Sequence, residues 1–267
     1  MKPLSQLTKE DIKDLKLVVF DVDGVTIKKG TNIEEIKTPL ETKFTIRTNN
    51  LTPEMKDKLR ELKKHFFVAI CSGRSSLYLT DVFNDLLWDN FALISEIGIF
   101  TLINGELKQN KKFDAHSLNK MRLIKNDLNK LIGDKPDMAD FELKQFLITL
   151  HASHEIPEVK EIMKRNDPEE EFYCLWNGEA FDIAPKILDK GQSIKFLAKE
   201  LGIGIHQTMA SGNGINDKSM TDAAGIGIST DKKSLESDYY TEGKEELGGF
   251  EIIDKLLELS KGDSATP

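Results

Sequence analysis

The sequence predicts an α/β fold in which a doubly wound parallel sheet is interrupted by an inserted α+β domain. Three observations lead to this prediction. Short apolar runs typical of buried strands alternate with amphipathic helical patterns at both ends of the chain. Two of these runs end in turns rich in acidic residues, serine and glycine, and open α/β sheets bind ligands at such strand ends. The pattern changes between about residue 112 and residue 184 and then resumes, which indicates an insertion.

The composition is that of a soluble globular protein. Of the 267 residues, 39% are hydrophobic and 31% are charged, and we expect two domains. The formal net charge of -8 argues against a general nucleic-acid or anionic-membrane binder. The sequence has no apolar signal segment or membrane-length apolar run, so we expect a cytoplasmic protein. Cys71 and Cys174 are expected to be buried small apolar residues rather than a disulfide.

The apolar run Leu17–Phe20 is followed at once by two acids one residue apart. Alternate residues of an extended chain point the same way, so the carboxylates of Asp21 and Asp23 should lie together, with Gly24 allowing a sharp turn. Neighbouring carboxylates repel unless a cation or a shared proton relieves them. The pair therefore indicates either a hard-cation site or a nucleophile beside an acid/base, and an acidic surface turn is the alternative.

A hairpin, a helix and a second strand are expected next. Residues 27–50 are polar and partly strand-like, which suggests a small flap hairpin. Thr52 should cap a helix that has Pro53 at its first position and ends near His65. The apolar run 66–71 then completes a βαβ unit.

The second strand delivers Ser72-Gly73-Arg74 to the sheet edge where Asp21 is expected. The first part of the core then continues with a helix over 75–87, a strand over 91–95 and a hairpin around Asn104-Gly105. After the insertion the core is expected to contain a helix over 192–201, a strand near 207–211, a helix from Asn216, a strand over 225–228 and a last helix over 249–260.

The insertion reads as a separate α+β domain. Its expected elements are a helix over 119–132, a strand over 141–152, a helix over 157–164 and two final strands. Asn177-Gly178 should join those two strands as a hairpin. The alternation of their side chains fits a sheet that helices cover on one face.

The stretch from Ser211 to Asp217 follows a late strand and opens a helix. It combines oxygen-bearing side chains, flexible glycine backbone and a positive helix N-terminus, and such a turn can hold a cation or a phosphate. Taken alone, it can equally be a plain strand-to-helix turn.

Four stretches, in order, resemble the motifs of the haloacid dehalogenase superfamily of phosphotransferases. They are Asp21-Val22-Asp23-Gly24, Ser72-Gly73-Arg74, Lys190-Gly191 and Gly212-Asn213-Gly214-Ile215-Asn216-Asp217. The resemblance implies a Rossmann-like core, residues 1–111 and 185–267, with a cap of residues 112–184. The position of the insertion, between the second and third motifs, is similar to the type-two cap of Cof-like sugar phosphatases, trehalose-6-phosphate phosphatases and eukaryotic phosphomannomutases.

Two cap stretches are similar to segments of these sugar phosphatases. The stretch from Glu142-Leu143-Lys144 to Thr149-Leu150-His151 resembles a cap strand of the trehalose-6-phosphate phosphatase group, and residues 180–185 resemble the strand that leads to the motif lysine. Glu142 and Lys144 alternate with the apolar positions of this stretch, so both side chains can face the catalytic mouth and bind sugar hydroxyls. From the residues alone, these two charges can equally be solvated.

The resemblance implies a two-step phosphoryl transfer. Asp21 attacks phosphorus and forms an aspartyl-phosphate, while Asp23 protonates the leaving alcohol and then activates water. Ser72 and Lys190 bind the phosphate and are counted with the catalytic residues. The expected substrate-binding residues are Ser72, Gly73, Arg74, Glu142, Lys144, Lys190 and Asn216. An arginine that opens a helix, as Arg74 does, can equally form a structural ion pair.

The resemblance also implies a magnesium ion, which offsets carboxylate and phosphate charge. Its expected ligands are Asp21, the Val22 backbone carbonyl and Asn213, with Asp23 and Asp217 in the metal shell. Many relatives carry aspartate where this chain has Asn213, and a neutral ligand should hold the ion less tightly.

Two further positions depart from the family pattern. Val25 stands where threonine is usual, and Ile97 stands where sugar-phosphatase relatives often have asparagine.

From the motifs together, we expect a magnesium-dependent phosphatase of a small phosphorylated sugar or polyol, a monomer or homodimer that binds neither nucleic acid nor membrane. The alternatives are a phosphomutase of the phosphomannomutase kind and a weakly active regulatory protein that binds a sugar phosphate.

Overall fold

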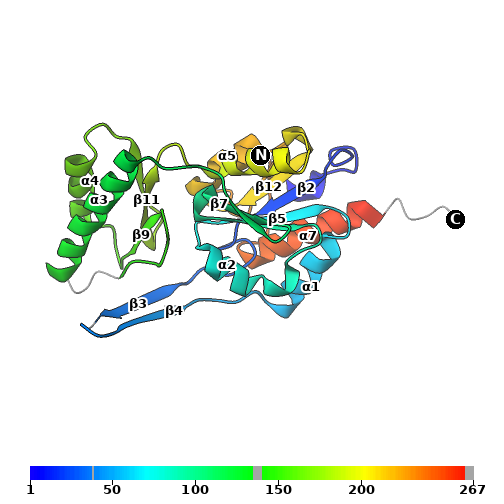
Figure 1. Cartoon of the computed structure of the whole chain (residues 1–267). Coiled ribbons are helices and arrows are strands. Elements are labelled where there is room, and N and C mark those ends of the chain that lie inside the picture. The colour runs from blue at the N-terminus through cyan, green and yellow to red at the C-terminus, as the bar shows by residue number, and fades with distance from the viewer. Residues whose placement is uncertain (38, 135–139, 262–267) are drawn as a thin grey trace. The chain divides into compact units, whose positions relative to one another are not determined.

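A computed structural model describes residues 1–37, 39–134 and 140–261, and it divides into two compact units (Figure 1). The first unit contains residues 1–29, 49–110 and 189–267, and the second contains residues 30–48 and 111–188. The long insertion therefore forms the bulk of the second unit. The role of residues 112–184 as a specificity cap stays a prediction.

A nine-stranded sheet forms the centre of the first unit, in the order β1-β14-β13-β12-β2-β5-β6-β7-β8. The pairs from β1 to β6 are parallel, and the pairs β6–β7 and β7–β8 are antiparallel. The strands are β1 (Lys2–Pro3), β2 (Leu17–Phe20), β5 (Phe67–Cys71), β6 (Phe91–Ser95), β7 (Phe100–Ile103), β8 (Glu106–Gln109), β12 (Thr208–Gly212), β13 (Ile226–Ser229) and β14 (Tyr239–Tyr240). This parallel-dominated sheet confirms the predicted α/β class.

Helices cover both faces of this sheet, as the alternation of side chains along β2 makes clear. Val18 and Phe20 pack into an apolar cluster with α1 and α7, whereas Leu17 and Val19 pack into a second cluster with α5 and α6. The α-helices of this unit are α1 (Pro53–Leu62), α2 (Ser76–Val82), α5 (Lys190–Glu200), α6 (Lys218–Ala223) and α7 (Glu246–Ser260). Short 3-10 helices are η1 (Leu4–Gln6), η2 (Asn84–Leu86), η3 (Glu96–Gly98), η4 (Ile205–Gln207) and η5 (Ile215–Asp217). Because β2 is buried on both faces, its end can carry reactive groups on a rigid support.

Local sequence signals locate several core elements correctly. Thr52 caps α1, since its Oγ1 accepts a hydrogen bond from the Met55 N–H at 3.3 Å. The hairpin at Asn104-Gly105 joins β7 to β8 as expected. The helix expected over 75–87 is shorter, because Phe83 leaves the helical conformation at φ -102° and ψ 15° and a 3-10 turn follows. α7 begins at Glu246, three residues before the expected start.

The second unit contains an antiparallel sheet in the order β10-β11-β9, covered by two helices. Its elements are β9 (Ile148–His151), β10 (Phe172–Trp176), β11 (Ala180–Pro185), α3 (Ala115–Asp134) and α4 (Pro157–Asn166). The turn at Asn177-Gly178 joins β10 to β11, as predicted. The observed arrangement is the expected α+β domain. None of the helices in the described ranges is long and apolar enough to cross a membrane.

The strand predicted over 141–152 is wrong in its first half. Only β9 is a strand there, while Phe141 forms an isolated antiparallel bridge with Leu150. The Glu142 N–H also donates to the Thr149 carbonyl at 3.0 Å. The chain therefore doubles back on itself between residues 141 and 150 instead of running straight, and residues 142–147 form the return.

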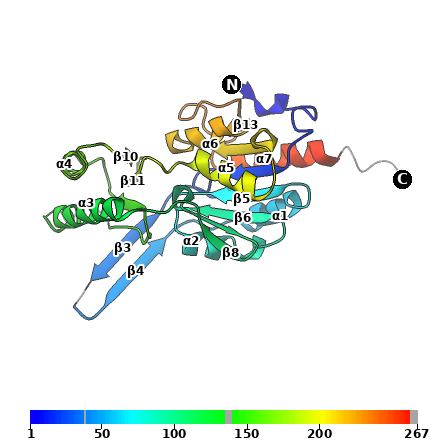
Figure 2. The same ribbon diagram turned by 45° about the horizontal axis from the view of Figure 1, so that its top comes forward.

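The predicted flap hairpin is present as two strands that are paired only with each other. β3 (Asn32–Lys37) and β4 (Thr42–Arg47) are antiparallel, and Figures 1 and 2 show them as a long two-stranded ribbon. Residue 38 at its tip lies outside the described residues.

The two cysteines are free thiols, and Cys71 is more deeply buried than Cys174. Cys71 is fully buried in β5, and burial raises its pKa to about 12. Cys174 is half-buried, and burial raises its pKa to about 11. Both thiols are therefore neutral at physiological pH and poor nucleophiles.

A buried ammonium ties α3 to the segment that follows α4. The Lys120 side chain is only 6% exposed, and its Nζ donates to Asp167 at 2.7 Å, Glu171 at 2.6 Å and Glu169 at 3.1 Å. Burial by itself would lower the pKa of Lys120, but the three carboxylates outweigh burial and raise that pKa. The cluster is thus a structural ion network inside the second unit.

We expect Lys120→Met to destabilise the protein, because Asp167 is buried and would lose its charged partner. The free energy of unfolding should fall by about 2 kcal/mol, measured by urea denaturation. Lys130→Met is the matched control, since Lys130 lies on the same helix but is 77% exposed. Equal stability of the two variants would contradict a structural role for the Lys120 cluster.

Candidate active site

Three neighbouring strands bring the predicted motifs to one edge of the first unit's sheet. β2 lies between β12 and β5, so Asp21 after β2 is flanked by the Ser211–Gly212 end of β12 and by Ser72 after β5. The Asp21 N–H donates to the Ser211 carbonyl at 3.0 Å. This edge is formed by the carboxyl ends of parallel strands, where α/β proteins bind ligands.

The turn after Asp21 is closed by the Val22 carbonyl. That oxygen accepts hydrogen bonds from the backbone N–H groups of Val25, Thr26 and Ile27 at 3.2, 3.0 and 3.0 Å. The expectation that the Val22 carbonyl binds a cation is therefore wrong, since this oxygen faces into its own turn. The Asp23 carbonyl, by contrast, accepts a hydrogen bond from the Asn213 side chain, at 2.7 Å from Nδ2.

Gly24 makes this turn possible in two ways. Its φ of +82° lies in the region that favours glycine, and a Cβ atom there would lie 1.8 Å from Asn213 Nδ2. The Gly24 carbonyl also accepts a hydrogen bond from Thr230 Oγ1 at 2.9 Å. The Thr230 contact has no signal in the sequence, because the two residues are far apart in the chain.

Lys190 lies buried between two carboxylates. Its Nζ donates to Asp21 Oδ1 at 2.7 Å and to Asp217 Oδ1 at 2.6 Å, and its side chain is 1% exposed. Burial and the nearby Asp217 carboxylate raise the pKa of Asp21 to about 7, and Lys190 opposes that rise. Burial would lower the pKa of Lys190, but the two carboxylates outweigh it and raise that pKa. The ammonium is thus a fixed positive charge beside Asp21.

Both oxygens of Asp217 are engaged in hydrogen bonds. Oδ1 accepts from Lys190, and Oδ2 accepts from the backbone N–H groups of Asn213 at 2.9 Å and Gly214 at 3.2 Å. Asp217 therefore holds the lysine and shapes the loop after β12. Its expected place in a metal shell stays a prediction. Asn216, in the same loop, has its Oδ1 beside Gly214, 2.7 Å from where a Cβ atom would lie.

The oxygen donors near Asp21 suit a hard cation. They are the Asp21 carboxylate, the backbone carbonyl of Asp23 and the side-chain amide of Asn213, whose nitrogen faces the Asp23 carbonyl in this structure. Magnesium characteristically binds one or two carboxylates and keeps several waters or substrate oxygens, so this sparse set fits it. Within the described ranges, no group of three or more His, Cys, Asp or Glu side chains is arranged to hold a metal ion.

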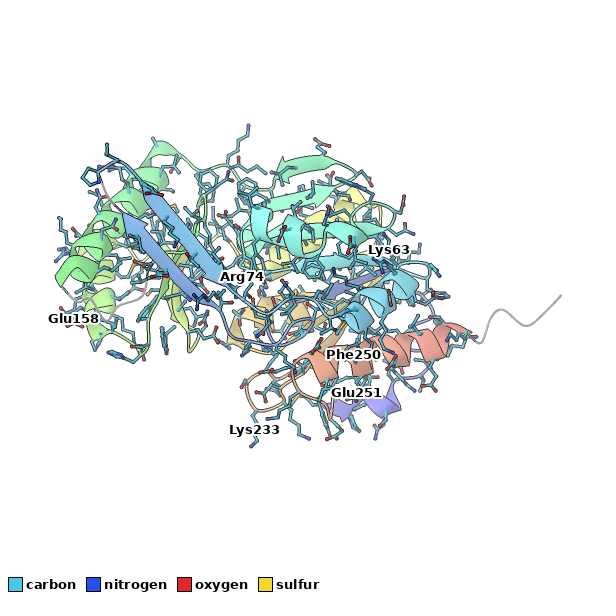
Figure 3. The ribbon with its side chains drawn as sticks, turned by 90° about the horizontal axis from the view of Figure 1, so that it is seen from below. Lys63, Arg74, Glu158, Lys233, Phe250 and Glu251 are labelled. Carbon is cyan, nitrogen blue, oxygen red and sulfur yellow. The ribbon has the colours of Figure 1, made fainter. Side chains whose placement is uncertain are left out.

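Arg74, which follows the neighbouring parallel strand β5, holds the Asp23 carboxylate. Its Nε donates to Asp23 Oδ2 at 2.9 Å and a terminal nitrogen donates to Oδ1 at 2.8 Å. The backbone N–H of Arg74 donates to Ser72 Oγ at 3.2 Å. Gly73 lies between these two residues. Arg74, which is labelled in Figure 3, was expected to bind substrate, and its side chain is paired with the second acid of the first motif.

A segment with left-handed backbone conformation, which follows β6, is hydrogen-bonded to Ser72 and Arg74. Glu96, Ile97 and Gly98 have φ values of 48°, 55° and 92°, and all three are buried. The N–H of Glu96 donates to the Arg74 carbonyl at 2.9 Å, and the N–H of Ile97 donates to the Ser72 carbonyl at 3.0 Å. A β-branched residue such as Ile97 rarely adopts this conformation, so the surrounding contacts enforce it. In the sequence, the only sign that position 97 is unusual is that sugar-phosphatase relatives often have asparagine there.

Glu142 and Lys144 belong to the second unit and contact each other there. Lys144 Nζ lies 3.2 Å from Glu142 Oε2 and donates to Thr149 Oγ1 at 2.6 Å. Thr149 in turn donates to Asp182 Oδ1 at 2.6 Å, and His151 Nε2 lies 3.3 Å from Glu142 Oε2. All five side chains are largely buried, so the two predicted residues are part of a larger polar network.

Comparisons with known proteins agree with this geometry. A family model described as haloacid dehalogenase-like hydrolase matches residues 121–234. The phosphatase YwpJ of Bacillus subtilis is 38% identical over 82 residues, which are 29% of this chain and 28% of that protein. The chain thus matches well under two thirds of the length of this relative.

Solved structures share the fold along nearly the whole chain. A trehalose-6-phosphate phosphatase related protein has a TM-score of 0.66 at 15% identity, covering 92% of this chain and 97% of that one. The C-terminal domain of the C. albicans trehalose-6-phosphate phosphatase has a TM-score of 0.68 at 16% identity, covering 95% of each chain. A haloacid dehalogenase-like hydrolase from B. subtilis has a TM-score of 0.64 at 17% identity, covering 92% of this chain and all of the other.

The structural matches show a shared fold, and the family model and the YwpJ match show sequence similarity over less than half of the chain. The same edge of the sheet also carries all four sequence motifs, with Asp21 and Lys190 in direct contact. Residues 121–234 are thus similar to the haloacid dehalogenase-like hydrolases, and the chain shares its fold with a solved protein of that description.

Proposed function

We propose that the protein is a magnesium-dependent phosphatase that hydrolyses a small phosphorylated sugar or polyol through Asp21. One observation carries the proposal: Asp21 ends a buried strand with one oxygen fixed by the Lys190 ammonium, so the carboxylate is oriented and its charge is partly offset. A carboxylate held in this way is a competent covalent carrier of a phosphoryl group. The match of residues 121–234 to the haloacid dehalogenase-like hydrolase model supports the same chemistry.

In the proposed first step, a carboxylate oxygen of Asp21 forms a bond to phosphorus as the bond from phosphorus to the alcohol oxygen breaks. Asp23 gives its proton to that oxygen, and the alcohol leaves. In the second step Asp23 takes a proton from water, whose oxygen bonds to phosphorus as the bond to Asp21 breaks. The products are the alcohol and inorganic phosphate, and both carboxyl groups return to their starting states.

Two groups are positioned to receive the phosphate oxygens. Ser72 Oγ lies at the end of β5 beside Asp21's strand, and Lys190 provides a buried positive charge. Removing one such electrostatic contact typically costs about 3 kcal/mol in the transition state, or about 100-fold in rate. A bound magnesium ion would supply further positive charge against the phosphate, with Asp21, the Asp23 carbonyl and Asn213 to hold it.

The polar network of the second unit is our candidate for sugar selection. Glu142 and Lys144 offer an acceptor and a donor, which is what recognition of sugar hydroxyls requires. The fold shared with trehalose-6-phosphate phosphatases supports a phosphorylated sugar as the substrate class.

Asp21→Asn is expected to abolish turnover while leaving the fold intact. The amide is a poor nucleophile, yet its oxygen can still accept the Lys190 hydrogen bond, and Lys190 keeps Asp217 as a partner. The measurement is phosphate release from a panel of sugar and polyol phosphates, with magnesium and with chelator. Asp222→Asn is the matched control, because that carboxylate is 55% exposed on α6. Undiminished hydrolysis by Asp21→Asn would remove Asp21 as the nucleophile.

The same panel separates the alternatives. A phosphomutase would need a bisphosphate activator and would return the phosphate to a sugar, whereas a regulatory protein would bind a compound without releasing phosphate. Either result would overturn the phosphatase proposal.

Asn213→Asp should tighten magnesium binding. The new carboxylate would replace the amide that donates to the Asp23 carbonyl, so two oxygens would face each other and the variant should be less stable without a cation. A bound cation should therefore stabilise the variant more than it stabilises the wild type. We expect a lower melting temperature in chelator and a larger rise on magnesium titration than in the wild type. Asn119→Asp, on exposed α3 surface, controls for added charge. A weaker magnesium response in Asn213→Asp would contradict the assignment of Asn213 as a ligand.

A further inference from the structure

We propose that Arg74 is the positioning residue for Asp23, so that the arginine contributes to catalysis through the acid/base and not by binding substrate. This inference rests on the proposed function and adds a role that the motif pattern does not assign. It starts from the bidentate contact of the Arg74 guanidinium with both oxygens of Asp23, at 2.9 and 2.8 Å.

A bidentate contact fixes more than the charge of Asp23. Two parallel N–H donors hold both oxygens, so the plane and the rotation of the carboxylate are set together. Asp23 would otherwise have considerable freedom, because its side chain is 26% exposed and the residue lies in a turn, directly before Gly24. General acid/base catalysis needs the carboxylate within hydrogen-bond reach of the proton that it moves.

The guanidinium itself is held by the fold. The Arg74 side chain is only 8% exposed, and its guanidinium carbon lies 5.2 Å from the centre of the Tyr78 ring, in the first turn of α2. Its backbone carbonyl accepts from Glu96, in the left-handed segment after β6. Of the two partners in the ion pair, Arg74 is therefore the more firmly held, and Asp23 is the one that it orients.

Arg74 also links the two sides of the site. Its backbone N–H donates to Ser72 Oγ while its side chain holds Asp23, which lies 51 residues earlier in the chain. One residue thus relates the position of the phosphate-binding hydroxyl to that of the acid/base. Its guanidinium is already directed at a carboxylate, which argues against a phosphate as its main partner.

The test is a double-mutant cycle with p-nitrophenyl phosphate and magnesium. Its leaving group departs as a stable anion, so turnover depends chiefly on the second step, in which Asp23 takes the proton of water. We expect Asp23→Asn to lower kcat by about 100-fold and Arg74→Met to lower it by at least about 10-fold with KM unchanged. In the Asp23→Asn background, Arg74→Met should change kcat by less than about twofold.

Arg74→Lys and Arg60→Met are the companion variants. Lysine keeps the charge but cannot make the bidentate contact, so we expect it to recover only part of the lost kcat. Arg60 is 46% exposed on α1 and pairs with Asp57, so its replacement should leave kcat unchanged. A merely structural role for Arg74 would lower the melting temperature and would add to the effect of Asp23→Asn.

Additive effects of the two substitutions, or a raised KM in Arg74→Met, would overturn the inference and would return Arg74 to direct substrate binding. The ion pair has its own readout, which needs no substrate. The Arg74 Nε–H signal in a nitrogen–proton NMR spectrum, assigned through Arg74→Met, should exchange slowly in the wild type and quickly in Asp23→Asn. An unchanged signal in Asp23→Asn would also overturn it. Failure of the proposed function looks different, since Asp21→Asn would then keep its activity.

Discussion

The Lys190 ammonium, buried between Asp21 and Asp217, is the interaction on which the rest of the site depends. The three groups come from the end of β2, the start of α5 and the loop after β12, and two buried carboxylates would repel without the ammonium. Breaking such a buried pair by removing one partner is strongly destabilising. The charge that fixes the candidate nucleophile thus also joins three separate segments of the core.

Backbone contacts position the other residues around the cluster of Lys190, Asp21 and Asp217. The Val22 carbonyl closes the turn after Asp21, and Gly24 leaves room for the Asn213 side chain to approach the Asp23 carbonyl. On the other side, the left-handed segment at Glu96 and Ile97 holds the backbones of Ser72 and Arg74. Strained backbone of this kind persists only where its surroundings enforce it, and it is common at functional sites. The backbone conformation of the turns therefore determines the geometry of the site as much as the side-chain contacts do.

Features encoded by adjacent residues could be predicted from the sequence. The strand before Asp21, the Thr52 cap and the turns at Asn104-Gly105 and Asn177-Gly178 depend on local patterns, and the structure has them where expected. The prediction of one strand over residues 141–152 was wrong for a physical reason. Charged residues at 142 and 144 alternate with apolar ones as in a strand, but the chain doubles back and buries those charges against β9.

Contacts between distant segments and the direction of carbonyl groups could not be predicted. Residue types at Val22 and Asp23 do not tell which of the two carbonyls faces the Asn213 amide. The pairing of Arg74 with Asp23 depends on the adjacency of β2 and β5 and on the turn geometry after each strand. The motif spacing predicted which residues gather at the sheet edge, and the folded backbone decides which of them touch.

Detection of the covalent intermediate tests the central claim most directly. The enzyme would be quenched with acid during turnover of its best substrate in magnesium, digested, and examined by mass spectrometry for a phosphorylated residue. The account predicts one phosphoryl group on Asp21, absent from the Asp21→Asn variant. Phosphorylation of another residue, or rapid phosphate release with no phosphorylated enzyme at any time, would contradict it.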